Sequence, residues 1–331
     1  MSESVETAPK PPAGAERTSL RGLFAATEID ARIFGMLLAL IAILLTFHVL
    51  SGGKLISPAN MVTLAVQTSG VAIMATGMVL IIVSRNIDLS VGSQVGVLAM
   101  VYAILMTDFL PDVIGWPEVG SQLMWIVALA IGIGVGVSIG GLQGFIIAYA
   151  GVPAFVVTLG GLLALRGVVW VLSEGAAVTG IDSTFRQVGG GALGSLGGEV
   201  TWLLAIIGCI AVVLLLVYNR RQRQRFGIPL RPVWADLLIG GVACAVVLGL
   251  AWMANQQFYP RGIAAQRAEE LGIVVPEDQL GSYFPMGVSW PILLLIGVTI
   301  VMSFIATRRR FGRYVYAYGG NPEAADLAGI N

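Results

Sequence analysis

The sequence has little charge, little cysteine and a single histidine. Charged residues make up 11% of its 331 residues, whereas a typical soluble domain carries about 25%. A soluble protein of this length would need two domains with unusually uncharged surfaces, so a protein that exposes its surface to lipid is the better interpretation. Cys209 and Cys244 each lie within a long apolar stretch, which argues against a framework of disulfides.

Residue clusters typical of enzymes and metalloproteins are missing as well. The sequence shows no group of metal ligands, no nucleophile beside a base and no glycine-rich phosphate loop. The net charge is zero, which gives no indication of a nucleic-acid partner. We therefore expect no catalytic residue, no metal and no cofactor in this chain, and any energy for work must come from outside it.

Apolar residues, by contrast, make up 56% of the chain and form eight long stretches. A helix needs roughly 20 apolar residues to cross the core of a bilayer. We therefore expect an all-α, multi-pass membrane protein with about eight transmembrane helices. The third and fifth stretches are flanked by glycine or proline, so each is either a complete span or a broken, partly re-entrant one. The eight stretches are 33–50, 61–83, 91–109, 124–149, 154–172, 201–218, 234–253 and 288–306.

Basic residues are distributed unevenly between the two sides that eight crossings define. One side carries 14 lysines and arginines, and the other carries 4. Because basic residues concentrate in cytoplasmic loops, we expect a cytoplasmic amino terminus. The chain then divides into a disordered cytoplasmic tail (1–32), a transmembrane domain (33–306) and a cytoplasmic carboxyl-terminal segment (307–331).

Glycines recur at every fourth position of the fourth stretch, at Gly132, Gly136, Gly140 and Gly144. Residues four apart share one face of a helix. In a membrane, a face of small residues lets a neighbouring helix approach closely. A smooth wall along a solute pathway is the alternative interpretation.

The carboxyl-terminal segment contains a short helix with recognisable ends. Asn321 is a good N-cap residue and Pro322 suits the first helical position, whereas Gly329 can end the helix in a left-handed conformation. We therefore predict a helix over residues 322–328. Its small apolar side chains cannot be buried within so short a helix, so it needs a groove on a partner. These residues are Ala324, Ala325 and Ala328, with Leu327 beside them.

Three segments resemble one family of membrane proteins. Glu323, Ala324 and Ala325, followed three residues later by a glycine, resemble the EAA-x3-G pattern of permeases in binding-protein-dependent ABC importers. GMVLIIVSRNIDLSVGSQVGVLA (77–99) and VPAFVVTLGGLLALRG (152–167) resemble markers of the ribose- and xylose-type branch, and the three occur in the order of that family. The arginine-rich loop at 219–233 is most similar to that of xylose-type members.

This resemblance implies a permease subunit for a monosaccharide, xylose or another pentose, in the inner membrane of a bacterium. It makes 33–306 the permease domain and 307–331 the coupling segment. It implies three protein partners in addition to membrane lipid: an ATPase subunit that binds and hydrolyses ATP, a periplasmic sugar-binding protein and a second copy of the permease. The chain itself would not be an enzyme. The residues expected to couple it to the ATPase are Glu323, Ala324, Ala325, Leu327, Ala328 and Gly329.

The sequence departs from the family pattern at two places. Asp326 stands where related permeases usually carry a basic residue, which changes the charge that faces the ATPase. The chain also stops at Asn331, where relatives continue with further spans. We therefore expect that it is truncated at its carboxyl end.

Four residues are candidates for the translocation path or its signature. The resemblance places Asp88, Ser90 and Gly92 in the IDLSVGS signature; Asp88 is also spaced to pair with Arg85 if the loop between them is helical. Arg166 lies within the fifth stretch, where a charge must face protein, water or a counter-charge. It is either a structural brace or a contact for solute.

An ion-coupled secondary transporter of a small neutral solute is the alternative function. Such proteins usually carry acidic groups near the middle of the membrane, and Asp88 lies at the edge of a stretch. The long loop at 255–287 faces the opposite side from the coupling segment. It is either a contact for the binding protein or a solvated cap.

Overall fold

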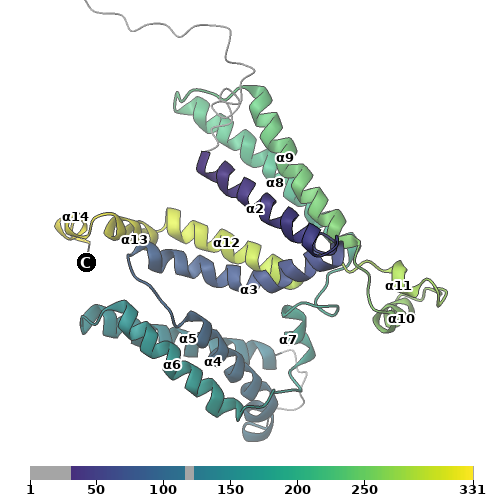
Figure 1. Cartoon of the computed structure of the whole chain (residues 1–331), viewed down its shortest axis with the longest axis horizontal. Coiled ribbons are helices and arrows are strands. Elements are labelled where there is room, and N and C mark those ends of the chain that lie inside the picture. Colours follow the sequence, from purple (N-terminus) through teal and green to yellow (C-terminus); the bar gives the residue numbers. More distant parts are fainter. Residues whose placement is uncertain (1–30, 116–122, 331) are drawn as a thin grey trace, which may run out of the picture. The chain divides into compact units, whose positions relative to one another are not determined.

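The computed structural model describes residues 31–115 and 123–330, which form helices joined by turns without any strand (Figure 1). It separates into two compact units. The first consists of Met1–Val62 and Gly197–Phe258, and the second of Thr63–Leu196 and Tyr259–Asn331. Apart from its last two residues, the predicted tail (1–32) lies outside the described residues.

Eight helices of the described chain are long and apolar enough to cross a membrane, which confirms the eight expected stretches. Their apolar side chains are largely exposed, as a surface in contact with lipid requires. They are α2 (Ala31–Leu50), α3 (Pro58–Val83), α4 (Val91–Ile104) continued by the π-helix η1 (Leu105–Val113), α5 (Met124–Tyr149), α6 (Ala154–Ser173), α8 (Gly198–Arg225), α9 (Val233–Asn255) and α12 (Trp290–Arg308).

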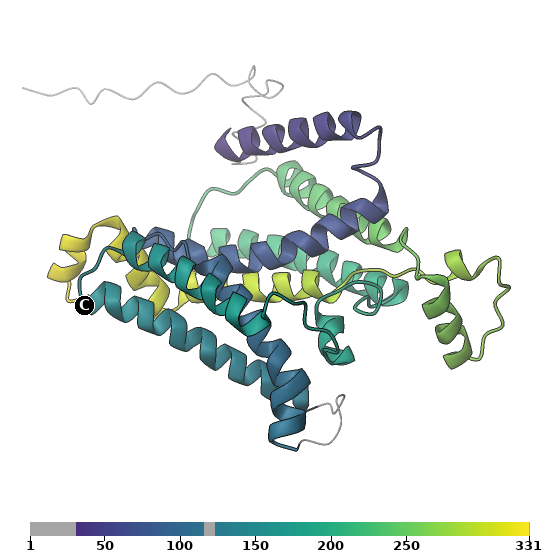
Figure 2. The ribbon, with the colours of Figure 1, turned by 60° about the horizontal axis from the view of Figure 1, so that its bottom comes forward.

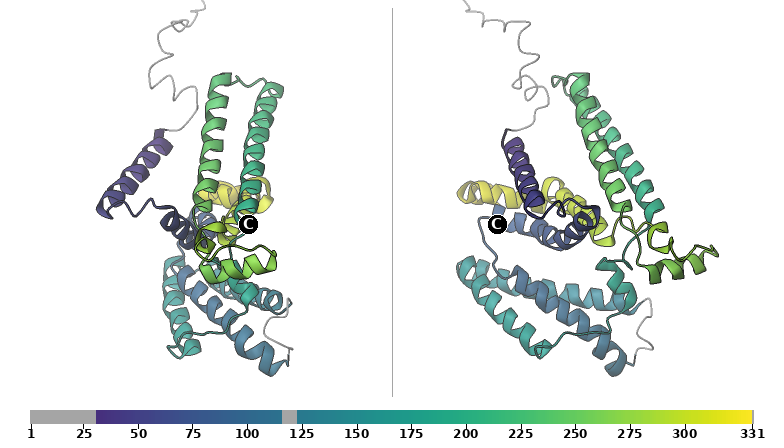
Figure 3. Two further views of the ribbon diagram at one scale, coloured as in Figure 1. Left: turned by 90° about the vertical axis from the view of Figure 1, so that its right-hand side faces the viewer. Right: turned by 45° about the vertical axis from the view of Figure 1, so that its right-hand side comes forward.

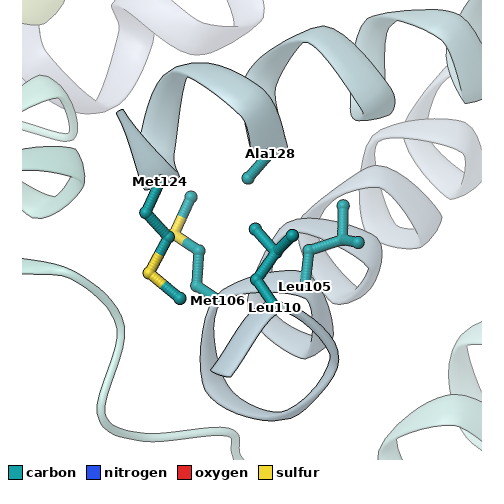
Figure 4. Packing of buried hydrophobic residues seen from close by; sticks show 5 residues of the cluster. All are labelled: Leu105, Met106, Leu110, Met124 and Ala128. Atoms are coloured by element: carbon teal, nitrogen blue, oxygen red, sulfur yellow. The ribbon is translucent and has the colours of Figure 1, made fainter. Parts of the chain in front are cut away.

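The third and fifth spans are both continuous. α6 runs without interruption, and η1 prolongs α4 by nine residues around Pro111. A proline cannot donate an intrahelical hydrogen bond, and the wider π-helical turn accommodates that loss. Figure 4 shows the result: η1 directs buried side chains against the start of α5. The cluster consists of Leu105, Met106, Leu110, Met124 and Ala128.

The glycine face of α5 packs against α4, and both helices lie beside α6 (Figures 1 and 2). A Cβ atom on Gly132 would overlap the ring of Tyr102, and one on Gly136 would lie 3.3 Å from Leu98. The Gln94 side chain donates a hydrogen bond to the Gly136 carbonyl at 3.0 Å. The packing interpretation is therefore confirmed at these two glycines, whereas Gly144 faces open space.

α8 and α9 form an antiparallel pair within the first unit (Figure 3). Arg220 of α8 and Asp236 of α9 form an ion pair near the turn between the helices. Cys209 and Cys244 lie opposite each other as free thiols, as expected. α8 continues to Arg225, well past the predicted end at residue 218, because arginine and glutamine favour helix even where the apolar pattern has ended.

The long loop contains two short helices, α10 (Arg261–Glu270) and α11 (Leu280–Tyr283). Tyr259 is 2% exposed, and its hydroxyl donates a hydrogen bond to the Ser195 carbonyl at 2.9 Å. The Arg267 guanidinium lies 4.4 Å from the centre of the Tyr259 ring. Burial raises the pKa of Tyr259, and the charge of Arg267 opposes this effect. These contacts give the loop an ordered attachment to the second unit.

The contact between Gly132 and Tyr102 provides a test of the packing. Gly132→Leu should destabilise the protein by about 1–3 kcal/mol, because the added side chain overpacks the contact between α5 and α4. Gly134→Leu on the same helix is the matched control, since a Cβ atom there meets nothing within 4 Å. The measurement is the thermal unfolding midpoint in detergent. Equal midpoints for the two variants would show that Gly132 is not a packing position.

Candidate coupling and translocation site

The coupling segment contains two helices, α13 (Arg310–Gly320) and α14 (Pro322–Leu327). The chain turns sharply between α12 and α13, where Gly312 packs on the last carbonyl groups of α12. A Cβ atom on Gly312 would overlap the carbonyl oxygens of Ile305 and Ala306, so this turn requires glycine. α13 was not predicted from the sequence, although Phe311, Val315 and Tyr318 recur at the spacing of one helix face.

The ends of α14 are formed as the sequence predicted. The Asn321 side chain accepts a hydrogen bond from the backbone N–H of Ala324 at 3.2 Å, and Pro322 occupies the first turn. Gly329 has a φ of +74°, and the N–H of Ile330 donates to the Ala325 carbonyl at 3.0 Å. The helix ends at Leu327, one residue before the predicted end. The cap prediction is therefore confirmed.

The face that α14 presents differs from the predicted one at a single residue. Ala325 is 4% exposed, because it faces its own chain, and it cannot contact a partner in this arrangement. Leu327 is 91% exposed and is the large apolar side chain that the helix offers. The remaining predicted coupling residues are exposed as well: Glu323, Ala324, Ala328 and Gly329.

The turn between α3 and α4 places Asp88 at the start of α4. Its Oδ1 accepts hydrogen bonds from the backbone N–H of Ser90 at 2.7 Å and from the Ser90 hydroxyl at 2.6 Å. The condition for a pairing of Asp88 with Arg85, a helical loop, is not met. Arg85 has a φ of +63°, so the loop is not helical and the two side chains do not share a face.

Two other membrane helices hold this turn in place. The Ser90 hydroxyl lies 3.0 Å from Oε1 of Gln143 on α5, and the Thr158 hydroxyl on α6 lies 3.2 Å from the Ile87 carbonyl. Ser90 and Thr158 are 0% and 2% exposed. Gly161 keeps room for Gln143, because a Cβ atom there would lie 2.6 Å from its amide nitrogen. Asp88 and Ser90 thus belong to a polar cluster among α4, α5 and α6.

Gly92 and Arg166 do not join this cluster. Gly92 is exposed, and a Cβ atom there would meet nothing within 4 Å. Arg166 is exposed on α6, and the described part of the chain gives it neither a hydrogen bond nor an ion pair. Both interpretations of Arg166, a structural brace and a contact for solute, therefore stay predictions.

Arg85 joins the signature turn to the coupling segment. Its Nε donates to the Gly319 carbonyl and its Nη2 to the Gly320 carbonyl, both at 2.8 Å. These carbonyls end α13, where helical acceptors lack intrahelical partners and a cation is favourable. A Cβ atom on Gly319 would overlap the Val83 carbonyl oxygen, so glycine permits the approach. This contact could not be predicted, because nothing in the sequence pattern links two positions 234 residues apart.

Comparison with known proteins identifies relatives of this chain. It is 33% identical over 305 residues to the xylose transport system permease protein XylH of Escherichia coli (strain K12), covering 92% of this chain and 66% of that protein. It is 31% identical over 309 residues to XylH of Haemophilus influenzae, covering 93% and 71%. The ribose import permease protein RbsC of Escherichia coli (strain K12) is 34% identical over 172 residues, covering 51% and 49%.

The chain thus spans about two thirds of the length of the xylose permeases that it matches. No solved structure matches it. A family described as the permease component of the branched-chain amino acid transport system matches residues 60–237, which is more than half of the chain. That range includes the Asp88 turn with its supports on α5 and α6. On these grounds the chain belongs to that family of transport-system permease components.

Proposed function

We propose that this protein is the membrane-spanning permease subunit of an ABC importer for a monosaccharide, xylose before other pentoses. The observation that carries the proposal is the exposed, capped helix α14, joined through Arg85 to the signature turn of the membrane helices. The family description names branched-chain amino acids, but the matches that cover 92–93% of this chain are xylose permeases. The sugar is therefore the better-supported solute.

In this proposal the chain hydrolyses nothing and receives its energy at α14. An ATPase subunit binds α14 in a groove, with Leu327 as the apolar anchor and Glu323 and Gly329 at the two ends of the helix. A short helix with one large exposed apolar residue has no means to bury that residue alone. Asp326, also exposed, adds a negative charge to the docking face.

Movement of α14 reaches the membrane through Arg85. Its two hydrogen bonds fix the end of α13 to the turn after α3, and that turn is fixed to α5 and α6 through Ser90 and Thr158. A displacement of the coupling segment therefore acts on several spans at once. Transport also requires that ATP and sugar prefer different conformations of these spans.

On the opposite side, residues 255–287 receive the sugar-binding protein. α10 and α11 are attached to the second unit by the buried Tyr259, while Leu271 and Val274 between them are 62% and 98% exposed. Exposed apolar side chains on an ordered support are typical of a protein contact. The complete assembly contains two permease copies in the bacterial inner membrane, each with a cytoplasmic amino terminus.

An ion-coupled secondary transporter is less well supported. A carrier of that kind uses acidic side chains near the middle of the membrane. Asp88 lies at the end of a span, and two hydrogen bonds from Ser90 occupy one of its oxygens. Asp236, at the start of α9, is paired with Arg220. The coupling segment would also have no role in such a carrier.

Uptake measurements separate the two functions. Proteoliposomes are prepared with the permease, with the ATPase and ATP in the lumen and with the binding protein outside. Labelled xylose should accumulate only when ATP and the binding protein are both present. A proton or sodium gradient without ATP should give no uptake. Accumulation driven by either gradient alone would overturn the proposal.

Docking through α14 is tested by two substitutions at exposed positions. Leu327→Arg and Glu323→Arg should each lower co-purification of the ATPase at least 10-fold, since they place charge in an apolar anchor or reverse the charge at the helix start. Val274→Arg is the control, because it alters an equally exposed apolar residue on the other side. Unchanged co-purification of Leu327→Arg would exclude α14 as the docking helix.

The link through Arg85 is tested separately from docking. Arg85→Gln and Gly319→Ala should retain the bound ATPase but lower xylose uptake per ATP hydrolysed at least 10-fold, because α14 can still dock while its movement no longer reaches the spans. Gly320→Ala is the neighbouring control, since a Cβ atom there meets nothing within 4 Å. An unchanged ratio of uptake to hydrolysis in Arg85→Gln would show that the link does not transmit movement.

A further inference from the structure

A hollow runs along the antiparallel pair of α8 and α9, and no residue of the coupling segment lines it. One part of it is an apolar groove of about 400 Å³. Val213, Leu216 and Val217 of α8 line one wall, and Val233, Leu237 and Gly241 of α9 line the other.

Two adjacent glycines explain the shape of this groove. At Gly240 a Cβ atom would lie 2.8 Å from Leu216, so this glycine sets the close approach of the helices. At Gly241 a Cβ atom would meet nothing within 4 Å. The absence of a side chain at Gly241 therefore leaves the groove open without being needed for helix packing.

Beyond the groove lies a basic hollow of about 470 Å³. Arg223 and Arg231 contribute its charge, and Asn219 and Gln222 contribute neutral polar groups. The segment 219–236 contains five arginines and one carboxylate, that of Asp236. Asp236 is paired with Arg220, and the segment as a whole carries five positive charges and one negative charge.

The groove and the basic hollow form one continuous track. A small space between them shares Arg220 and Asp236 with the groove and shares Asn219, Arg223 and Arg231 with the basic hollow. At 28 residues, α8 is about 42 Å long, whereas the apolar core of a bilayer is about 30 Å thick. The arginine end of α8 therefore extends to the level of the lipid headgroups.

We propose that this track is a binding site for an anionic phospholipid. The phosphate lies in the basic hollow near Arg223 and Arg231, and an acyl chain lies in the groove over Gly241. Arginine binds phosphate through paired, charge-assisted hydrogen bonds, and basic pockets beside membrane helices bind anionic headgroups. The order of apolar and basic surface along the helices matches the order of chain and headgroup in a lipid.

Other occupants fit only one part of the track. An acidic peptide would satisfy the arginines, but it would leave the apolar groove empty at the depth of the membrane core. A transmembrane helix from a second copy would fill the groove, but it would bring no negative charge to the arginines. An anionic lipid satisfies both parts, and its binding does not depend on the proposed transport function.

The test compares two lipids on the purified protein. Equimolar phosphatidylglycerol and phosphatidylcholine are added in detergent, and the lipids retained are measured by native mass spectrometry. The protein should retain phosphatidylglycerol in preference to phosphatidylcholine. Arg223→Gln with Arg231→Gln, and separately Gly241→Leu, should lower this retention at least 10-fold, the first by removing charge and the second by filling the groove.

Each variant has a matched control. Arg308→Gln with Arg310→Gln removes two arginines elsewhere, and Gly249→Leu adds the same side chain to α9 at a position with open space outside the groove. Both controls should retain the lipid as the unaltered protein does. Gly241→Leu leaves every arginine in place, so its result does not depend on whether the double arginine variant folds.

Three results would overturn the proposal. The first is equal retention of the two lipids by the unaltered protein. The second is full retention of phosphatidylglycerol by both Gly241→Leu and the double arginine variant. The third is loss of dimers rather than of lipid in Gly241→Leu, which would identify a second copy as the occupant of the groove.

Discussion

The guanidinium of Arg85 connects the membrane helices of the second unit to the segment that follows α12. It donates to two carbonyls at the end of α13, which would otherwise be exposed acceptors at a helix terminus. The contact requires glycine at position 319, because a side chain would separate α13 from α3. Together with the turn between α12 and α13, this contact attaches the coupling segment to the membrane helices.

Small residues determine how closely α4, α5 and α6 pack against one another. Lipid is as apolar as leucine, so helices in a membrane associate through close contact and hydrogen bonds rather than through the hydrophobic effect. Gly132, Gly136 and Gly161 permit such contact, and Gln94 and Gln143 add hydrogen bonds where the backbones come near. The same principle operates at Gly240 between α8 and α9. The high glycine content of the sequence thus permits close helix packing at these particular positions.

Much of the fold was predictable because the signals were local. Eight apolar stretches predicted eight spans, and Asn321 and Gly329 predicted the ends of α14. Two expectations depended on conformations that the structure does not have. Arg85 and Asp88 do not pair because the loop between them is not helical, and Ala325 is buried, so its role in docking stays a prediction.

The sequence by itself determined that the chain is a membrane protein, approximately where its spans lie and that it resembles sugar permeases. Composition, periodicity and motifs are properties of neighbouring residues, so they can be read without the fold. Only the tertiary structure decided that Arg85 binds the end of α13, that Ser90 meets α5 and that arginines adjoin an apolar groove. Such contacts depend on the directions of side chains from separate helices. Hydrophobic patterning shows which face of a helix a side chain lies on, but it does not show which helix that face contacts.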